Sequence, residues 1–179
     1  MYNRIISYLE KFSILHNNQF GFRSKHSTTH ALLFLTDKIQ RSVDNGTYCC
    51  GIFLDLCTFD TVDHKILLAK LEYYGIRGVA HDWFASYLSN RGQFVSLFGT
   101  NSDYQIVTCG VPQGSVLGPL LFLLYINDTP KCSNILEFHL FADDTNLFLH
   151  NPNILNLETI LNVELEKISQ WLYALTNYL

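Results

Sequence analysis

Two adjacent carboxylates, Asp143 and Asp144, lie between apolar residues in the segment FHLFADDTNLF at 138–148. The apolar residues on both sides predict two strands joined by a tight turn, with the carboxylates at its tip. Neighbouring carboxylates repel each other, and a charge near an apolar core is costly unless a counter-charge neutralises it. One interpretation of the pair is therefore a bound cation. The alternative is a solvated hairpin turn, because Asp is common in turns.

A second acidic segment, LDLCTFDTVDH at 54–64, places Asp55 near the end of an apolar run. The run from Tyr48 to Leu56 predicts a strand that is covered on both faces. We expect Asp60 and Asp63 to cap the helix that follows and not to bind metal.

The remaining elements follow from hydrophobic periodicity. Helical spacing predicts an inner face of Leu32, Leu35, Ile39 and Val43 within residues 28–44. Alternation at period two predicts a hairpin over 93–97 and 104–109. Further helices are expected over 64–74, 79–89, 116–126 and 154–172, the last with an inner face of Leu157, Leu161, Leu165, Ile168 and Leu172. Because helices and strands mix without strict alternation, we predict an α+β fold with an antiparallel sheet packed on helices.

The composition suits one folded domain, since 48% of the 179 residues are hydrophobic. No apolar run is long enough to cross a bilayer, and the N-terminal segment lacks a signal-peptide core. We therefore expect an intracellular protein, in the nucleus, the cytoplasm or both, with no membrane partner. We interpret the five cysteines as reduced thiols: Cys49, Cys50, Cys57, Cys109 and Cys132.

Charge is unevenly distributed along the chain. The net charge of −4 argues against a nucleic-acid binder, yet residues 1–91 hold ten Lys and Arg against eight Asp and Glu. Residues 92–179 hold two basic against eight acidic residues. The basic half is suited to a phosphate backbone and the acidic half to a metal, although a solvated surface explains the pattern equally well.

Four segments together resemble one family. The chain is similar to the reverse transcriptase of non-LTR retrotransposons, the LINE type that includes jockey and CR1-like elements. A lone FADD would be weak evidence, whereas GVPQGSVLGP is highly specific, and the resemblance covers nearly the whole chain. The four segments, in order, are QFGFRSKHSTTHALL (19–33), LDL…FDTVDH (54–64), GVPQGSVLGPLLFLLYIND (110–128) and FADD (141–144).

This resemblance implies a right-hand polymerase palm with part of the fingers, and no thumb. Residues 1–179 would be a partial reverse transcriptase domain, with fingers over about 1–47 and a palm with inserted fingers helices over about 48–179. The implied reaction adds deoxynucleotides to a DNA 3′ end on an RNA template. The implied partners are the RNA template, the DNA primer and deoxynucleoside triphosphates, whereas the oligomeric state is not implied.

The resemblance also implies a metal site. Asp55, Asp143 and Asp144 would be the catalytic carboxylates, and two adjacent antiparallel strands would bring them together. The backbone carbonyl of Leu56 is a further candidate ligand. The expected cofactors are two Mg²⁺ ions about 4 Å apart, with Mn²⁺ as a substitute, which clamp the attacking and leaving oxygens.

The segment GVPQGS is expected to lie against the template and nucleotide. Gly110 and Gly114 let the backbone pass close to a base pair, and Pro112 stiffens the approach. Gln113 would hydrogen-bond near the nascent pair, and Ser115 would cap the following helix. The alternative is a turn that only starts this helix.

Two further residues have competing interpretations. The resemblance places Phe59 under the sugar, where it excludes a 2′ hydroxyl; the alternative is a core Phe. Three residues separate Asp55 from Phe59, one fewer than in the family, which would rotate Phe59 and affect the placing of Asp55. Arg23, with Lys25, would contact the template backbone; the alternative is a solvated basic turn.

We expect this chain to be a fragment or a degenerate copy, weakly active or inactive alone, because a polymerase without a thumb holds its duplex poorly. The main alternative is a non-catalytic RNA-binding remnant of the same fold. Another metal-dependent palm enzyme, such as a nucleotide cyclase, is a third interpretation. GVPQGSVLGP speaks against it, since a cyclase has no template.

Overall fold

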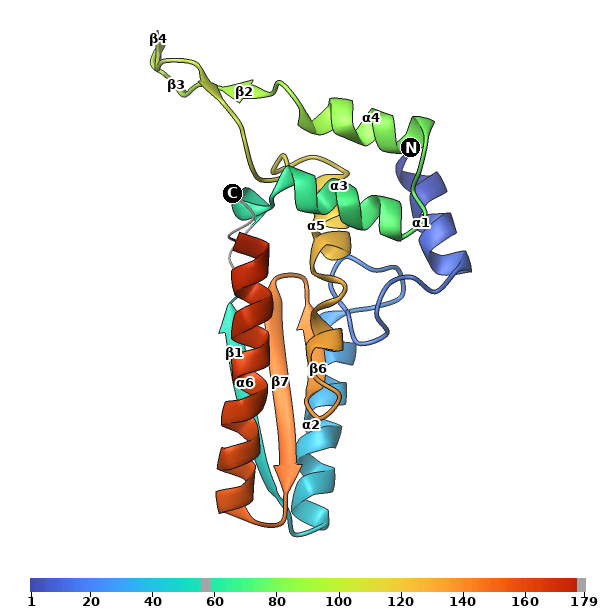
Figure 1. The fold of residues 1–179 in the computed structure, drawn as a ribbon, viewed down its shortest axis with the longest axis vertical. Helices are drawn as coiled ribbons and strands as arrows, with labels where there is room; N and C mark the ends of the chain where they lie inside the picture. The colour runs from blue at the N-terminus through green and yellow to red at the C-terminus, as the bar shows by residue number, and fades with distance from the viewer. Residues whose placement is uncertain (56–58, 177–179) are drawn as a thin grey trace.

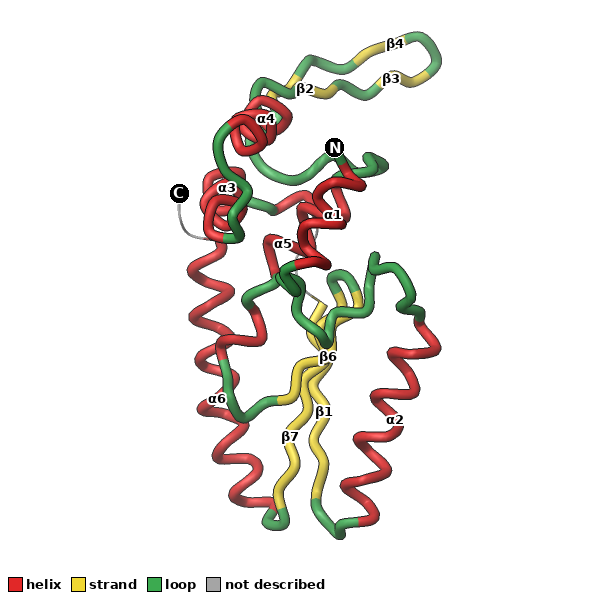
Figure 2. The backbone as a smooth tube through the Cα atoms, turned by 90° about the vertical axis from the view of Figure 1, so that its right-hand side faces the viewer, coloured by secondary structure: helices red, strands yellow, loops and turns green. Residues whose placement is uncertain are grey.

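The computed structural model describes residues 1–55 and 59–176 and has the predicted α+β architecture. A three-stranded antiparallel sheet lies between two long helices, α2 (Thr28–Asp44) and α6 (Ile154–Thr176), which cover opposite faces (Figures 1 and 2). At one end of the sheet the remaining helices form a second layer. No helix in the described ranges is long and apolar enough to span a membrane.

The sheet is formed by β1 (Tyr48–Asp55), β6 (Glu137–Phe141) and β7 (Asp144–Asn151), in the order β1-β7-β6. Strands β6 and β7 form the predicted hairpin, so their turn and the end of β1 lie at the same end of the sheet.

One face of this sheet packs on α6. The predicted inner face of α6 is confirmed, because all its residues join one apolar cluster with the sheet. Leu157 and Ile168 are buried, and Leu161, Leu165 and Leu172 pack at its margin. On the sheet, the cluster is completed by Leu136, Phe138, Leu147 and Leu149.

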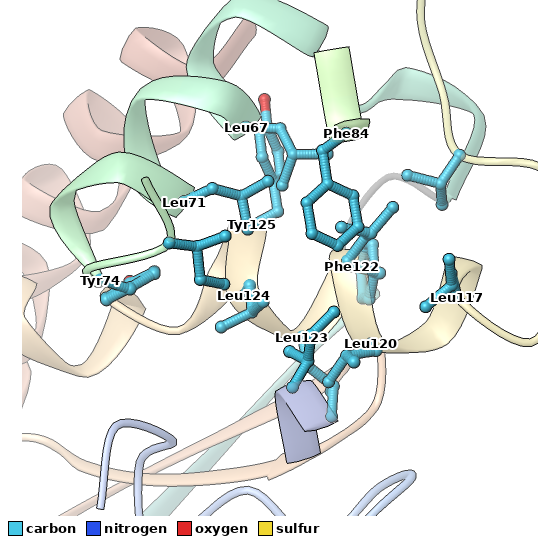
Figure 3. Packing of buried hydrophobic residues seen from close by; sticks show 14 of the residues in the cluster. Leu67, Leu71, Tyr74, Phe84, Leu117, Leu120, Phe122, Leu123, Leu124 and Tyr125 are labelled. Atoms are coloured by element: carbon cyan, nitrogen blue, oxygen red, sulfur yellow. The ribbon is translucent and has the colours of Figure 1, made fainter. Parts of the chain in front are cut away.

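The second core surrounds α5 (Gly118–Ile126), whose side chains are buried from Leu120 to Ile126. This helix is apolar on every side, and it is enclosed by α1 (Tyr2–Lys11), α3 (His64–Tyr73) and α4 (Val79–Leu88). Figure 3 shows how Phe84 of α4 and Leu67 and Leu71 of α3 meet α5. Short 3₁₀ turns at Phe59–Thr61 and Thr129–Cys132 border this core.

The predicted inner face of α2 is wrong for three of its four residues, whereas Leu35 is half-buried as expected. Leu32, Ile39 and Val43 are exposed, and the sheet-facing side includes Ala31 and Ser42. Polar contacts orient the helix: the Ser42 hydroxyl bonds to the His150 ring, and Lys38 pairs with Glu137 at 2.5 Å. Hydrophobic periodicity cannot predict part-buried polar contacts of this kind.

Strand β1 is likewise not covered on both faces. It is an edge strand, and the Phe53 side chain is 69% exposed. An unbroken apolar run predicts a strand, but it does not distinguish a central position from an edge.

The predicted hairpin after α4 is confirmed, although its strands are short and exposed. They are β2 (Gly92–Gln93), β3 (Ser96–Leu97), β4 (Thr100–Asn101) and β5 (Gln105–Ile106), paired β2 with β5 and β3 with β4. The hairpin projects away from the rest of the chain (Figure 1).

A stack of aromatic rings joins α2 to the sheet. The His139 ring of β6 lies between Phe20 and Phe34, with centroids 4.8 and 5.4 Å away. His139 is buried, and this burial lowers its pKa below the ordinary value of 6.5. The small side chain of Ala31 is buried on the same side of α2.

The orientation of α2 predicts a large effect for a substitution on its sheet-facing side and a small effect for one on its exposed side. Ser42→Leu should lower the free energy of unfolding by about 1–3 kcal/mol, because Ser42 is 4% exposed and the larger side chain both loses the hydrogen bond to His150 and overpacks the site. Leu32→Ala should change it by less than about 0.5 kcal/mol, because Leu32 is 61% exposed. Urea denaturation of both variants measures this, and the reverse order would restore the orientation predicted from hydrophobicity.

The lowered pKa of His139 predicts acid sensitivity. As the pH falls through 6.5, the unfolded chain takes up this proton before the folded chain does, so stability decreases. His139→Phe should therefore lose less stability than the wild type between about pH 7.5 and about pH 5.5. Some loss should remain, because burial also lowers the pKa of His16. Equal losses in the two proteins, measured by denaturant titration, would contradict the assignment.

Candidate functional site

The pairing of β1 with β7 places Asp55 directly opposite Asp144. Residues opposite each other in an antiparallel pair point to the same face of the sheet, with Cα atoms about 4.5–5.5 Å apart. Both carboxylates line a cavity of about 630 Å³ between the sheet and the N-terminal half of α2. Two acidic segments that are distant in the sequence therefore share one cavity.

Asp143 lies in the turn between β6 and β7. Phe141 pairs with Asp144, so the turn consists of Ala142 and Asp143 alone. Ala142 has φ of 56°, which is unusual for a residue with a Cβ. The predicted tight turn is confirmed, but only Asp143 lies at its tip, because Asp144 is the first residue of β7. Asp143 is half-buried, whereas Asp144 is exposed.

The chemistry of these donors suits a hard divalent cation. None of the salt bridges in the described part of the chain involves Asp55, Asp143 or Asp144. Mg²⁺ prefers oxygen ligands and keeps waters and substrate phosphates in its shell, so a few carboxylates suffice. Within residues 1–55 and 59–176 no group of three or more His, Cys, Asp or Glu side chains is placed so that it could hold a metal ion. The structure therefore brings Asp55 and Asp144 to one cavity, but it does not gather them with Asp143 as a set of three ligands. Leu56, the predicted carbonyl ligand, lies outside the described residues.

The loop at 110–114 is fastened to the segment that follows β1. Gly110 donates its N–H to Val62 O at 2.7 Å, and its carbonyl lies 2.7 Å from His64 Nε2. Its φ is 85°, and a Cβ there would lie 2.8 Å from the backbone of Asp60. The need for glycine at this position thus comes from contact within the chain, without any bound nucleic acid.

A second cavity, of about 670 Å³, is lined by Gly110, Pro112 and Gln113 of this loop. Gln113 donates to both carboxylate oxygens of Asp60, at 2.8 and 2.9 Å, and Pro112 lies beside it. Gly114 is exposed, with φ of 75°. Ser115 caps α5 from outside the N-cap position, which is Leu117: its hydroxyl accepts the N–H of Gly118, the first residue of the helix, at 2.9 Å.

The acidic residues before α3 behave differently from each other. Asp63 caps α3 as predicted, accepting the N–H of Ile66 at 2.8 Å. Asp60 does not cap this helix; its carboxylate binds Gln113 instead. The cause is the 3₁₀ turn at Phe59–Thr61, which separates Asp60 from the helix start.

Phe59 and Arg23 both make contacts within the chain. The Phe59 ring stacks on Phe122, with centroids 4.4 Å apart, and meets Phe22 edge-on at 6.1 Å. Arg23 Nη1 donates to two carbonyls, His16 O at 2.9 Å and Gln19 O at 3.2 Å. Burial lowers the pKa of Arg23. Arg23 thus fixes the loop before α2 and is not a wholly solvated basic residue.

The sequence analysis missed Gln19. Its side chain is 2% exposed and hydrogen-bonds the backbone of Ala142, in the turn that carries Asp143. The only signal was its position inside the QFGFR segment, one of the four segments that carry the family resemblance.

Comparisons with known proteins identify the family of this chain. The profile of the reverse transcriptase (RNA-dependent DNA polymerase) family matches residues 1–177. The chain is 34% identical to the probable RNA-directed DNA polymerase from transposon BS of Drosophila melanogaster, over 86% of this chain and 18% of that protein.

Two further Drosophila melanogaster proteins are similar. The probable RNA-directed DNA polymerase from transposon X-element is 38% identical over 72% of this chain and 14% of its own length. The RNA-directed DNA polymerase from mobile element jockey is 30% identical over 94% of this chain and 19% of its own length. The chain therefore spans less than a fifth of these curated relatives. On these matches the chain belongs to the reverse transcriptase (RNA-dependent DNA polymerase) family, as its four motifs predicted.

Proposed function

We propose that this chain forms part of an RNA-directed DNA polymerase that extends a DNA 3′ end on an RNA template. The observation that carries the proposal is the placement of Asp55 opposite Asp144 beside one cavity. Membership of the reverse transcriptase family supports the reaction class. The proposed partners are the RNA template, the DNA primer and deoxynucleoside triphosphates.

The proposed division of the chain has two parts. Residues 1–47 would belong to the fingers, and residues 48–179 to a palm with inserted fingers helices. The β1-β7-β6 sheet with helices on its faces supports a palm, because its strands carry the acidic residues to one end.

Asp55, Asp143 and Asp144 are proposed to hold two Mg²⁺ ions, or Mn²⁺, with the Leu56 carbonyl as a further ligand. When bound, such ions would lower the pKa of the primer 3′ hydroxyl and neutralise charge on the triphosphate. Asp55 and Asp144 fit this role, since both line the cavity and neither takes part in a salt bridge within the described residues. The exposure of Asp144 leaves it open to solvent and substrate.

Gly110, Pro112, Gln113 and Gly114 are proposed to contact the template and the incoming nucleotide. Support comes from the second cavity, which Gly110, Pro112 and Gln113 line. The bidentate contact with Asp60 holds the Gln113 amide in place before any substrate arrives.

Phe59 is proposed to lie beneath the nucleotide sugar. Its stacking on Phe122 would hold the ring in a single orientation there. Arg23 is proposed to contact the template backbone through its guanidinium nitrogens other than Nη1, which is engaged by the loop carbonyls.

Removal of one carboxylate tests the proposed reaction. Asp144→Asn should reduce primer extension on an RNA template by more than about 100-fold, because even outer-shell partners of a metal are worth about 10–100-fold. Asp103→Asn, an exposed change on the projecting hairpin, is the matched control and should leave extension unchanged. Single-turnover measurement with excess protein allows a slow reaction to be followed.

The outcomes separate the candidate functions. Equal extension by Asp144→Asn and the wild type would contradict the assignment of this carboxylate. Absence of extension in both, with equal RNA affinity, would favour the non-catalytic RNA-binding remnant.

Metal binding should also be visible in stability. A ligand that binds only the folded chain at about 100 times its Kd stabilises it by about 2.7 kcal/mol, so Mg²⁺ should raise the Tm of the wild type. The double variant Asp55→Asn, Asp144→Asn should show no such rise. Without metal it should be at least as stable as the wild type, because two facing like charges have been removed. Scanning calorimetry with Mg²⁺ and with EDTA measures both effects; an equal rise in the two proteins would contradict the site.

A further inference from the structure

The turn that carries the acidic pair has an unfavourable backbone conformation at its first residue. Ala142 has φ of 56°, in the left-handed region that residues with a Cβ rarely adopt. Such a conformation persists only where the surrounding structure enforces it. Ala142 is buried, so both of its backbone polar groups also need partners within the chain.

Gln19 supplies both partners from a distant part of the sequence. Its Oε1 accepts the N–H of Ala142 at 3.0 Å, and its Nε2 donates to the carbonyl of Ala142 at 3.3 Å. A side-chain amide is suited to this task, since it carries a donor and an acceptor side by side. A single side chain therefore holds the peptide groups on both sides of Ala142.

The residues around Gln19 hold its amide in this position. Asn18 and Phe20 continue the sheet beyond β6: Leu140 N donates to Asn18 O at 2.9 Å, and Phe20 N donates to Leu140 O at 2.8 Å. Gly21 donates its N–H to Gln19 Oε1 at 2.8 Å. A Cβ on Gly21 would collide with the backbone nitrogen of Ala142, so glycine allows the two segments to touch.

We propose that Gln19 is a positioning residue for the carboxylates of Asp143 and Asp144. This inference rests on the proposed function, in which these carboxylates hold divalent metal. Metal ligands must be held close to their productive geometry by the groups behind them. Without the Gln19 amide, both polar groups of Ala142 lose their partner, and the turn relaxes away from φ of 56°. The two carboxylates then lose their fixed direction.

The test compares two substitutions on adjacent residues of the 179-residue chain. Gln19→Met keeps the length of the side chain and removes both hydrogen bonds. Asn18→Leu is the matched control, because Asn18 Nδ2 donates to Phe138 O at 2.8 Å, on the same strand but away from the turn. Gln19→Glu keeps the acceptor for Ala142 and removes the donor, and it serves as the comparison if Gln19→Met does not fold.

Three quantities are measured for each protein. They are the Kd for Mn²⁺ by electron paramagnetic resonance, the Mg²⁺ concentration for half-maximal primer extension, and hydrogen exchange at the Ala142 amide. Gln19→Met should raise the Mn²⁺ Kd and the Mg²⁺ requirement about tenfold or more, as expected for loss of an outer-shell partner. It should also accelerate exchange at Ala142. Gln19→Glu should give smaller changes, and Asn18→Leu should leave the metal constants at wild-type values.

Failure of the inference is distinct from failure of the proposed function. If Gln19→Met and Asn18→Leu have the same metal constants as the wild type, while the wild type binds metal and extends primers, the inference is overturned and the function stands. If the wild type neither binds Mn²⁺ nor extends a primer, the proposed function is overturned and the inference with it.

Discussion

The register between β1 and β7 is the constraint on which the site depends. Side chains alternate between the faces of a strand, so a slip of one residue would move every side chain to the opposite face. The apolar cluster with α6 forbids this slip, because Leu147 and Leu149 of β7 are buried against the helix. Asp55 and Asp144 therefore lie on the opposite face of the sheet from α6. In this way the hydrophobic core of the sheet determines which residues meet at the acidic end.

Hydrogen bonds between segments that are distant in the sequence hold the loops around that end of the sheet in place. The segment at 18–21 joins the outer edge of β6 and holds the turn, and the loop at 110–113 is tied to residues 59–64. Each glycine with a steric requirement here, Gly21 and Gly110, lies where two backbones touch. The motifs that identify the family are thus also the places where separate parts of the chain contact one another.

Sequence patterns predicted the elements whose burial is purely hydrophobic. The inner face of α6, the acidic hairpin and the Ser115 cap all depend on local spacing. The orientation of α2 was not predictable in this way, because it depends on a hydrogen bond of Ser42 and a salt bridge of Lys38 to residues on the strands of the sheet. Helix α1 went unrecognised since only Ile5 and Leu9 mark its buried side. The role of Gln19 depends on a long-range contact that has no periodic signal.

The central claim is that Asp55 and the acidic turn together form one metal site. The most direct measurement is a crystal structure of the chain soaked in Mn²⁺, with the ion located by its anomalous scattering. We predict a peak within coordination distance, about 2.1 Å for a small divalent ion, of carboxylate oxygens from both Asp55 and the Asp143–Asp144 pair. Clear density for these side chains with no peak between them, or a register that turns Asp55 to the α6 face, would contradict it.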